Sequence, residues 1–170
     1  WSWATTRLAG AWPSSLATPA TVRVSRWGHY GTPVLLLPSA GADFEEVERF
    51  GLVEALRGPI ESGRIKVFSL DGLAAHAWLR GTLPPEQCAG AQRAHEEFIF
   101  QEVVPLIRRD CHSDGIEILA AGAAFGAFSA LATLCRHPDV FRGAIALSGS
   151  FDVSKLLCRA MTSEVEAVSP

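Results

Sequence analysis

Apolar and polar positions follow two different periods along the chain, one typical of strands and one typical of helices. Residues 21–27 alternate apolar and polar side chains, as a half-buried strand does. Residues 34–37 are a continuous apolar run, which is typical of a parallel strand covered on both faces. Segments rich in apolar residues predict three more strands at residues 64–70, 116–120 and 143–147. We therefore expect five strands.

Helical spacing of apolar residues separates these strands. Asp43 has the character of an N-cap, and an acidic first turn follows it. This helix is expected to end or kink at residues 58–59, which are Gly-Pro. A long helix is predicted over residues 86–109, with a bend at Pro105, and a shorter apolar helix over residues 125–135.

Alternating strands and helices predict an α/β fold, a three-layer α/β/α sandwich with a mostly parallel sheet. A length of 170 residues, with 48% hydrophobic and 19% charged residues, favours one globular domain over residues 1–170. Ligands in such sheets bind beyond the carboxyl ends of the strands. The loops after Leu37, Leu70, Ala120 and Leu147 should therefore form one functional edge.

Charge and composition argue against several partners. The net charge is only −3 and no basic run occurs, so we expect no nucleic-acid partner. The apolar stretch 118–128 is too short to cross a membrane, which takes about 20 residues. The chain begins at Trp1, so we expect a processed product or a fragment, and residues 1–20 lack the pattern of a secretory signal.

Cysteines and histidines suggest neither disulfides nor a metal site. The four cysteines are far apart and contain no Cys-x-x-Cys pair, which favours reduced thiols in a cytoplasmic protein. The five histidines show no ligand spacing, so we expect no metal and no cofactor. A dinucleotide site is also disfavoured, because no Gly-x-Gly-x-x-Gly follows the first strands.

The sharpest local motif is Gly122-Ala123-Ala124-Phe125-Gly126, between a predicted strand and a predicted helix. Gly-x-Ser-x-Gly at such a junction forms the nucleophile elbow of α/β-hydrolases, with small residues that let strand and helix approach. Here the central position is Ala124, which has no hydroxyl. On spacing alone, two glycines that simply ease a strand-to-helix turn explain the motif equally well.

Segments along most of the chain resemble the bacterial serine esterases of the α/β-hydrolase superfamily that are related to esterase D. The most specific is Arg136-His-Pro-Asp-Val-Phe141 followed by Ala146-Leu-Ser-Gly149. The others are residues 33–41, residues 64–71, Trp78 and residues 95–107. The resemblance covers about residues 20–155 and implies a Ser-His-Asp hydrolase of short-chain esters or thioesters.

The chain departs from that family pattern in two ways. Ala124 stands at the nucleophile position. The acid and the histidine follow the serine in chain order in this superfamily, yet only 44 residues follow Gly126 and no histidine follows His137. We therefore expect a C-terminally truncated hydrolase core that is catalytically inactive. Loss of a triad leaves only roughly 10³–10⁴-fold catalysis over water.

The resemblance also implies an oxyanion hole. Its donors would be the backbone N–H of Phe125 and one from Ala40 or Gly41, in the loop that begins with Ser39. Trp78 would lie over this pocket as a lid or packing residue. Such a hole suits a small acyl or carboxylate ligand.

Other polar candidates have simpler explanations. Ser129 is expected to point into a helix packed on the sheet, Ser148 and Ser150 to be turn residues, and Asp71 to form an Asp-Gly turn. A second interpretation of the whole chain is a knockout or truncated form of a longer active esterase. Truncation would leave residues 143–147 as an open apolar edge, which predicts a homo-oligomer or poor solubility.

Overall fold

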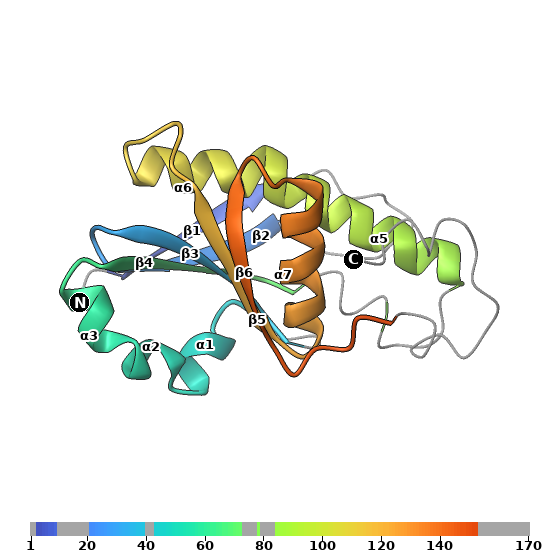
Figure 1. The fold of residues 1–170 in the computed structure, drawn as a ribbon, viewed down its shortest axis with the longest axis horizontal. Coiled ribbons are helices and arrows are strands. Elements are labelled where there is room, and N and C mark those ends of the chain that lie inside the picture. Colours follow the sequence, from blue (N-terminus) through green and yellow to red (C-terminus); the bar gives the residue numbers. More distant parts are fainter. Residues whose placement is uncertain (1–2, 10–20, 40–42, 73–77, 79–83, 153–170) are drawn as a thin grey trace.

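The structure is a computed structural model that describes residues 3–9, 21–39, 43–72, 78 and 84–152. Its strands form one sheet in the order β1-β2-β4-β3-β5-β6 (Figure 1). The strands are β1 (Trp3–Ala9), β2 (Thr21–Trp27), β3 (Thr32–Leu37), β4 (Ile65–Leu70), β5 (Ile118–Ala123) and β6 (Phe141–Leu147). Strands β4, β3, β5 and β6 run parallel, while β1 and β2 are antiparallel to their neighbours.

The five expected strands and the mostly parallel α/β class are confirmed. The strand expected at residues 116–120 begins two residues later and continues to Ala123, because it pairs with β6 as far as Leu147. β1 was not predicted. It pairs with the whole length of β2, from Trp3 opposite Trp27 to Ala9 opposite Thr21.

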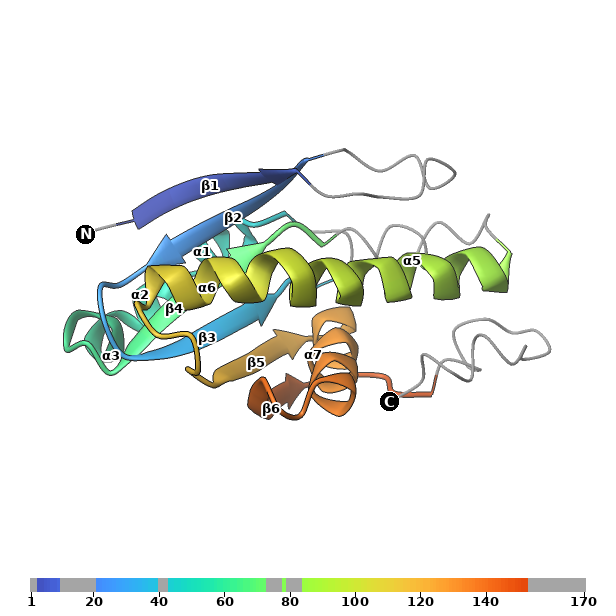
Figure 2. The same ribbon diagram turned by 90° about the horizontal axis from the view of Figure 1, so that it is seen from above.

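Helices cover both faces of the sheet (Figures 1 and 2). One face carries α1 (Glu46–Arg49), α2 (Leu52–Ala55) and α3 (Arg57–Glu61), and the other carries α5 (Pro85–Phe98), α6 (Val104–Asp110) and α7 (Phe125–Arg136). Leu35 packs in the core under α5–α7, and its neighbour Leu36 packs in the core under α1–α3. The apolar run of β3 therefore serves two cores, as expected for a parallel strand buried on both faces.

The single helix expected from Asp43 is wrong, because three short helices occupy that segment. Gly51, with φ of 70°, separates α1 from α2, because this left-handed conformation cannot continue a helix. The side chain of Asp43 accepts a hydrogen bond from the Glu45 N–H, but the N-cap itself is Glu45. Gly58 and Pro59 lie inside α3 and do not end it, because a proline is tolerated in the first helical turn.

The long helix is confirmed in extent, and its irregularity lies in the turn that precedes Pro105. A π-helical turn, Ile99–Val103, joins α5 to α6, and Pro105 lies in the first turn of α6. Pro105 has no N–H to donate to the carbonyl four residues earlier, at Gln101. The wider hydrogen bonding of the π turn accommodates this missing donor.

β6 lies at one end of the sheet, and no described strand pairs with its outer edge. Ile145 is 48% exposed and Leu147 is 59% exposed. Unpaired strand edges tend to pair with other chains. Self-association of the chain stays a prediction, and a soluble monomer in size-exclusion chromatography would contradict it.

None of the helices in the described part of the chain is both long enough and apolar enough to span a membrane.

Candidate functional site

The junction between β5 and α7 has a strained backbone at one residue. Ala124 lies between Ala123, which ends β5, and Phe125, which begins α7, with φ of 53° and ψ of −116°. A positive φ at a residue other than glycine costs roughly 1–3 kcal/mol and concentrates at functional sites. The Ala124 N–H donates to the carbonyl of Leu147 (3.0 Å), which ties the turn to the end of β6. The side chain of Ala124 is exposed, so its methyl group occupies the position from which a serine would present its hydroxyl.

The two flanking glycines are required by close contacts between backbones. A Cβ at Gly122 would lie 2.3 Å from the carbonyl carbon of Gly126. A Cβ at Gly126 would lie 2.2 Å from the carbonyl oxygen of Leu37, at the end of β3. Neither glycine has a positive φ. Their role is therefore to bring β3, β5 and α7 together rather than to supply turn flexibility, and this is the steric arrangement of a nucleophile elbow.

Of the expected oxyanion donors, the structure describes the Phe125 N–H. Phe125 is the first residue of α7, and an N–H at that position has no acceptor inside the helix. Ser39 is engaged elsewhere: its N–H donates to Glu46 Oε1 (3.0 Å) and its hydroxyl to Glu46 Oε2 (2.8 Å). Ala40 and Gly41, the candidates for the second donor, lie outside the described residues.

Two buried carboxylates hold the ends of the loop that follows β3. Glu46 fixes Ser39, and Asp71 fixes Phe44 by accepting its N–H at Oδ1 (3.2 Å). Asp71 Oδ2 also accepts the backbone N–H of Arg23 (2.9 Å), and the Arg23 guanidinium lies 4.3 Å from the centre of the Phe44 ring. Both flanks of residues 40–42 are thereby anchored.

Sequence reasoning missed this role of Glu46 and Asp71. The acidic turn that contains Glu46 was expected to favour a helix N-terminus, and Asp71 was expected to form an Asp-Gly turn in preference to binding a ligand. The partners of Asp71 lie 27 and 48 residues away in the chain. No local pattern could have indicated them, because a carboxylate's long-range partner is fixed by the tertiary fold.

An aromatic cluster lies beside the elbow. The ring centroids of Trp78 lie 6.5 Å from those of Phe125 and of Phe128, and the two phenylalanines are 5.7 Å apart. Such tilted and edge-on pairs are favourable aromatic geometries. Trp78, expected over the pocket, is thus placed against the residue expected to donate to an oxyanion.

The remaining candidates lie in other surroundings. Ser129 is buried in α7. His137 stacks on Phe100, 4.2 Å between ring centroids, at the far end of the 12-residue α7, about 18 Å from its start. His95 is buried in α5, where burial lowers the pKa of its imidazole to about 4. Ser148 has a φ of 53° and is exposed at the end of β6.

No three metal-ligating side chains converge anywhere in the described ranges. The described part of the elbow offers the Phe125 N–H and an aromatic wall, and Ala124, at the position predicted for a nucleophile, carries only a methyl group.

Comparison with solved structures gives the same fold. A ferulic acid esterase superposes with a TM-score of 0.67 at 17% identity, over 99% of this chain and 68% of its own length. The S-formylglutathione hydrolase FrmB from Staphylococcus aureus gives 0.64 at 15% identity, over 98% and 66%. MPT51 from Mycobacterium tuberculosis gives 0.60 at 21% identity, over 97% and 56%. The chain therefore spans about 56–68% of the length of these three solved chains.

Comparison with curated protein sequences found no match. A family model, described as "Putative esterase", matches residues 28–166 and therefore most of the chain. The matched range contains the elbow, the loop after β3 whose ends Glu46 and Asp71 hold, and the aromatic cluster. The chain belongs to this esterase family, and its fold is that of the α/β-hydrolases.

Proposed function

We propose that this chain is an esterase-family domain that binds a small acyl or carboxylate ligand without hydrolysing it. Ala124 carries the proposal. Its backbone has the positive φ of an elbow, and its glycine neighbours make the elbow's close contacts, but its side chain has no oxygen. An alanine cannot attack an ester carbonyl, because its methyl group has no lone pair.

The rest of the expected machinery supports binding rather than turnover. His137 lies at the end of α7 away from Ala124. The Phe125 N–H at the start of α7, together with the positive end of that helix, suits a carbonyl or carboxylate oxygen. The Trp78 and Phe125 rings offer an apolar surface to a short acyl chain.

The second candidate is a short-chain ester or thioester hydrolase seen here as a knockout or truncated form. It predicts that a serine at position 124 would act in a longer chain that supplies the acid and the histidine.

The first test is hydrolysis of p-nitrophenyl acetate and butyrate by the purified chain and by Ala124→Ser, with buffer as the blank. We expect neither protein to exceed buffer, because the variant regains a hydroxyl but no general base. Saturable turnover by the natural sequence would contradict the proposal. Turnover by Ala124→Ser alone would favour the knockout form of the second candidate.

The second test is binding of butyrate, measured by ligand-observed NMR. We expect saturable binding that Phe125→Ala and Trp78→Ala weaken, because these side chains form the aromatic wall. Phe50→Ala is the matched control, since Phe50 is 79% exposed and outside the elbow. Equal binding by all four proteins, or no binding at all, would show that the elbow is only a scaffold.

The proposal places the domain in the cytoplasm, where the thiols of Cys88, Cys111 and Cys135, which form no disulfide with any described residue, would remain reduced. It requires no cofactor, no nucleic acid and no membrane. It treats residues 1–170 as one α/β-hydrolase-like domain, with a second copy of the chain as the partner at the β6 edge.

A further inference from the structure

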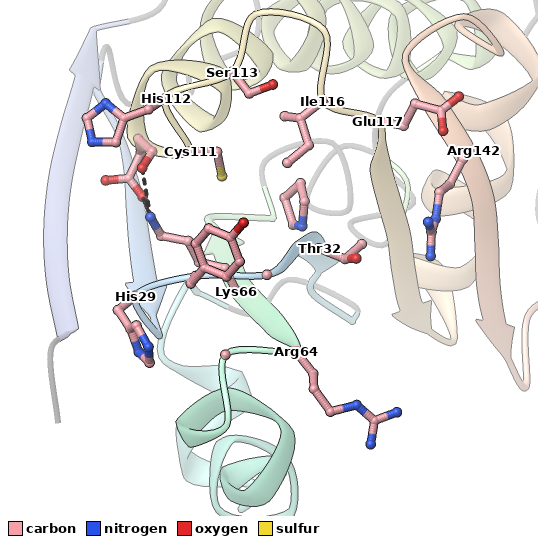
Figure 3. Close-up of a pocket in the computed structure, with 15 residues that line it drawn as sticks. His29, Thr32, Arg64, Lys66, Cys111, His112, Ser113, Ile116, Glu117 and Arg142 are labelled. Carbon is pink, nitrogen blue, oxygen red and sulfur yellow. Dashed lines mark hydrogen bonds and ion pairs between the residues drawn. The ribbon is translucent and has the colours of Figure 1, made fainter.

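A hollow lies at the amino ends of the parallel strands (Figure 3). Ala124 lies at the other edge of the sheet, after the carboxyl end of β5. Thr32 begins β3, Arg64 precedes β4, Glu117 precedes β5 and Arg142 is the second residue of β6. We call this hollow, lined by these residues, the amino-edge cleft. Its volume is about 820 Å³, within the range of small-molecule sites.

Positive charge is concentrated around the amino-edge cleft. A shallower hollow of about 550 Å³ adjoins it and shares four of its lining residues. Together the two are lined by five of the chain's 15 Lys and Arg residues but only two of its 18 Asp and Glu residues. The cations are Arg26, Arg64, Lys66, Arg109 and Arg142, and the acids are Asp110 and Glu117. A region of +3 on a chain of net charge −3 attracts anions.

The floor of the amino-edge cleft is a rigid ion-pair network. Lys66 is 3% exposed, and its Nζ contacts Asp110 at Oδ2 (2.6 Å) and at the backbone carbonyl (2.8 Å). Arg26 Nη1 contacts the other oxygen of Asp110, Oδ1, at 2.7 Å. Two cations therefore share one carboxylate, which leaves this floor with a net positive charge. Because Lys66 is buried and paired, ligand contacts must come from other residues.

Two arginines at the mouth are available for such contacts. Arg64 and Arg142 are exposed, and neither forms an ion pair with any residue that the structure describes. Figure 3 shows the Arg64 side chain extending from the segment just before β4 and the Arg142 side chain extending from β6. Thr32 begins β3, which lies between β4 and β6 in the order of the sheet. The ring of Tyr30, 74% exposed, lines the same hollow.

We propose that the amino-edge cleft binds a small molecule that carries a phosphate group. Arg64 and Arg142 would hold the phosphate from two directions, the Thr32 hydroxyl would add a third donor, and Tyr30 would contact the organic part. A tetrahedral phosphate accepts hydrogen bonds from several directions, whereas a carboxylate accepts them near one plane. Arginine forks that approach from separate strands therefore fit a phosphate better than a carboxylate.

The test is isothermal titration of the chain with phenyl phosphate, inorganic phosphate and benzoate at constant ionic strength. We expect phenyl phosphate to bind saturably, and more tightly than inorganic phosphate or benzoate. Arg64→Ala and Arg142→Ala should each weaken it about tenfold or more, because each removes hydrogen bonds between charged groups. Arg142→Lys should weaken it as well, since lysine keeps the charge but loses the fork.

Arg57→Ala is the matched control, because Arg57 lies in α3 and pairs with Glu54 away from the cleft. Thermal unfolding of every variant shows that each one folds. The proposal is overturned if phenyl phosphate gives no saturable binding, if benzoate binds equally well, or if Arg57→Ala weakens binding as much as Arg64→Ala. Binding of only a long polyanion, such as an acidic peptide or RNA, would also overturn it.

Discussion

Gly126→Ala is expected to lower the free energy of unfolding by at least about 3 kcal/mol, a large share of the 5–15 kcal/mol typical of a domain. The added Cβ would lie 2.2 Å from the Leu37 carbonyl oxygen and 2.8 Å from that of Pro38. Both contacts are with backbone, so no side-chain rotation can relieve them, and β3 must move away from α7. Urea unfolding followed by circular dichroism measures the loss.

Gly90→Ala is the matched control for this substitution. Gly90 lies in α5, and a Cβ there would meet nothing within 4 Å. Alanine favours a helix over glycine, so this variant should gain up to about 1 kcal/mol. If Gly126→Ala unfolded at the same urea concentration as the natural chain, the close approach of β3 and α7 would be wrong.

The second large effect is expected from acidification through His95. The pKa of this buried imidazole is lowered from its ordinary value of 6.5 to about 4 by loss of solvation. The unfolded chain therefore binds a proton between pH 6.5 and 4 that the folded chain does not, and stability falls as the pH is lowered through this range. This pKa shift lowers the free energy of unfolding by about 3 kcal/mol in total, and the loss is nearly complete at pH 4.

The measurement compares the free energy of unfolding of the natural chain with that of His95→Gln between pH 7 and pH 4. Glu96, the next residue, has a pKa raised by burial, which makes stability fall in the opposite direction, as the pH rises. It titrates in both proteins, so the difference between the two curves isolates His95. Parallel curves would mean that His95 is accessible to protons in the folded state.

The strands were predictable because burial on both faces leaves a plain signal in the sequence. The run 34–37 is apolar at every position, and the structure buries all four side chains. The helices on the α1–α3 face were less predictable. The segment after Asp43 has helical spacing, but a left-handed Gly51 divides it, and spacing alone does not report the sign of φ.

The candidate site was predictable where it depends on neighbours in sequence. Gly122, Ala124 and Gly126 are adjacent enough for a motif to reveal the elbow. The carboxylate clamp on the following loop was not, because Glu46 and Asp71 find their partners only in the folded sheet. The amino-edge cleft was missed for the same reason: its cations come from separate strand beginnings and form a cluster only in three dimensions.

At the elbow, the residues that the fold requires are different from the residue that would take part in a reaction. Its glycines are locked by backbone contacts, so almost any change at Gly122 or Gly126 harms folding and would be removed by selection for a stable protein. Position 124 is open to solvent, and exchange of a serine hydroxyl for hydrogen there removes little packing. An exchange between serine and alanine at position 124 would therefore change the chemistry of the elbow and leave its fold intact.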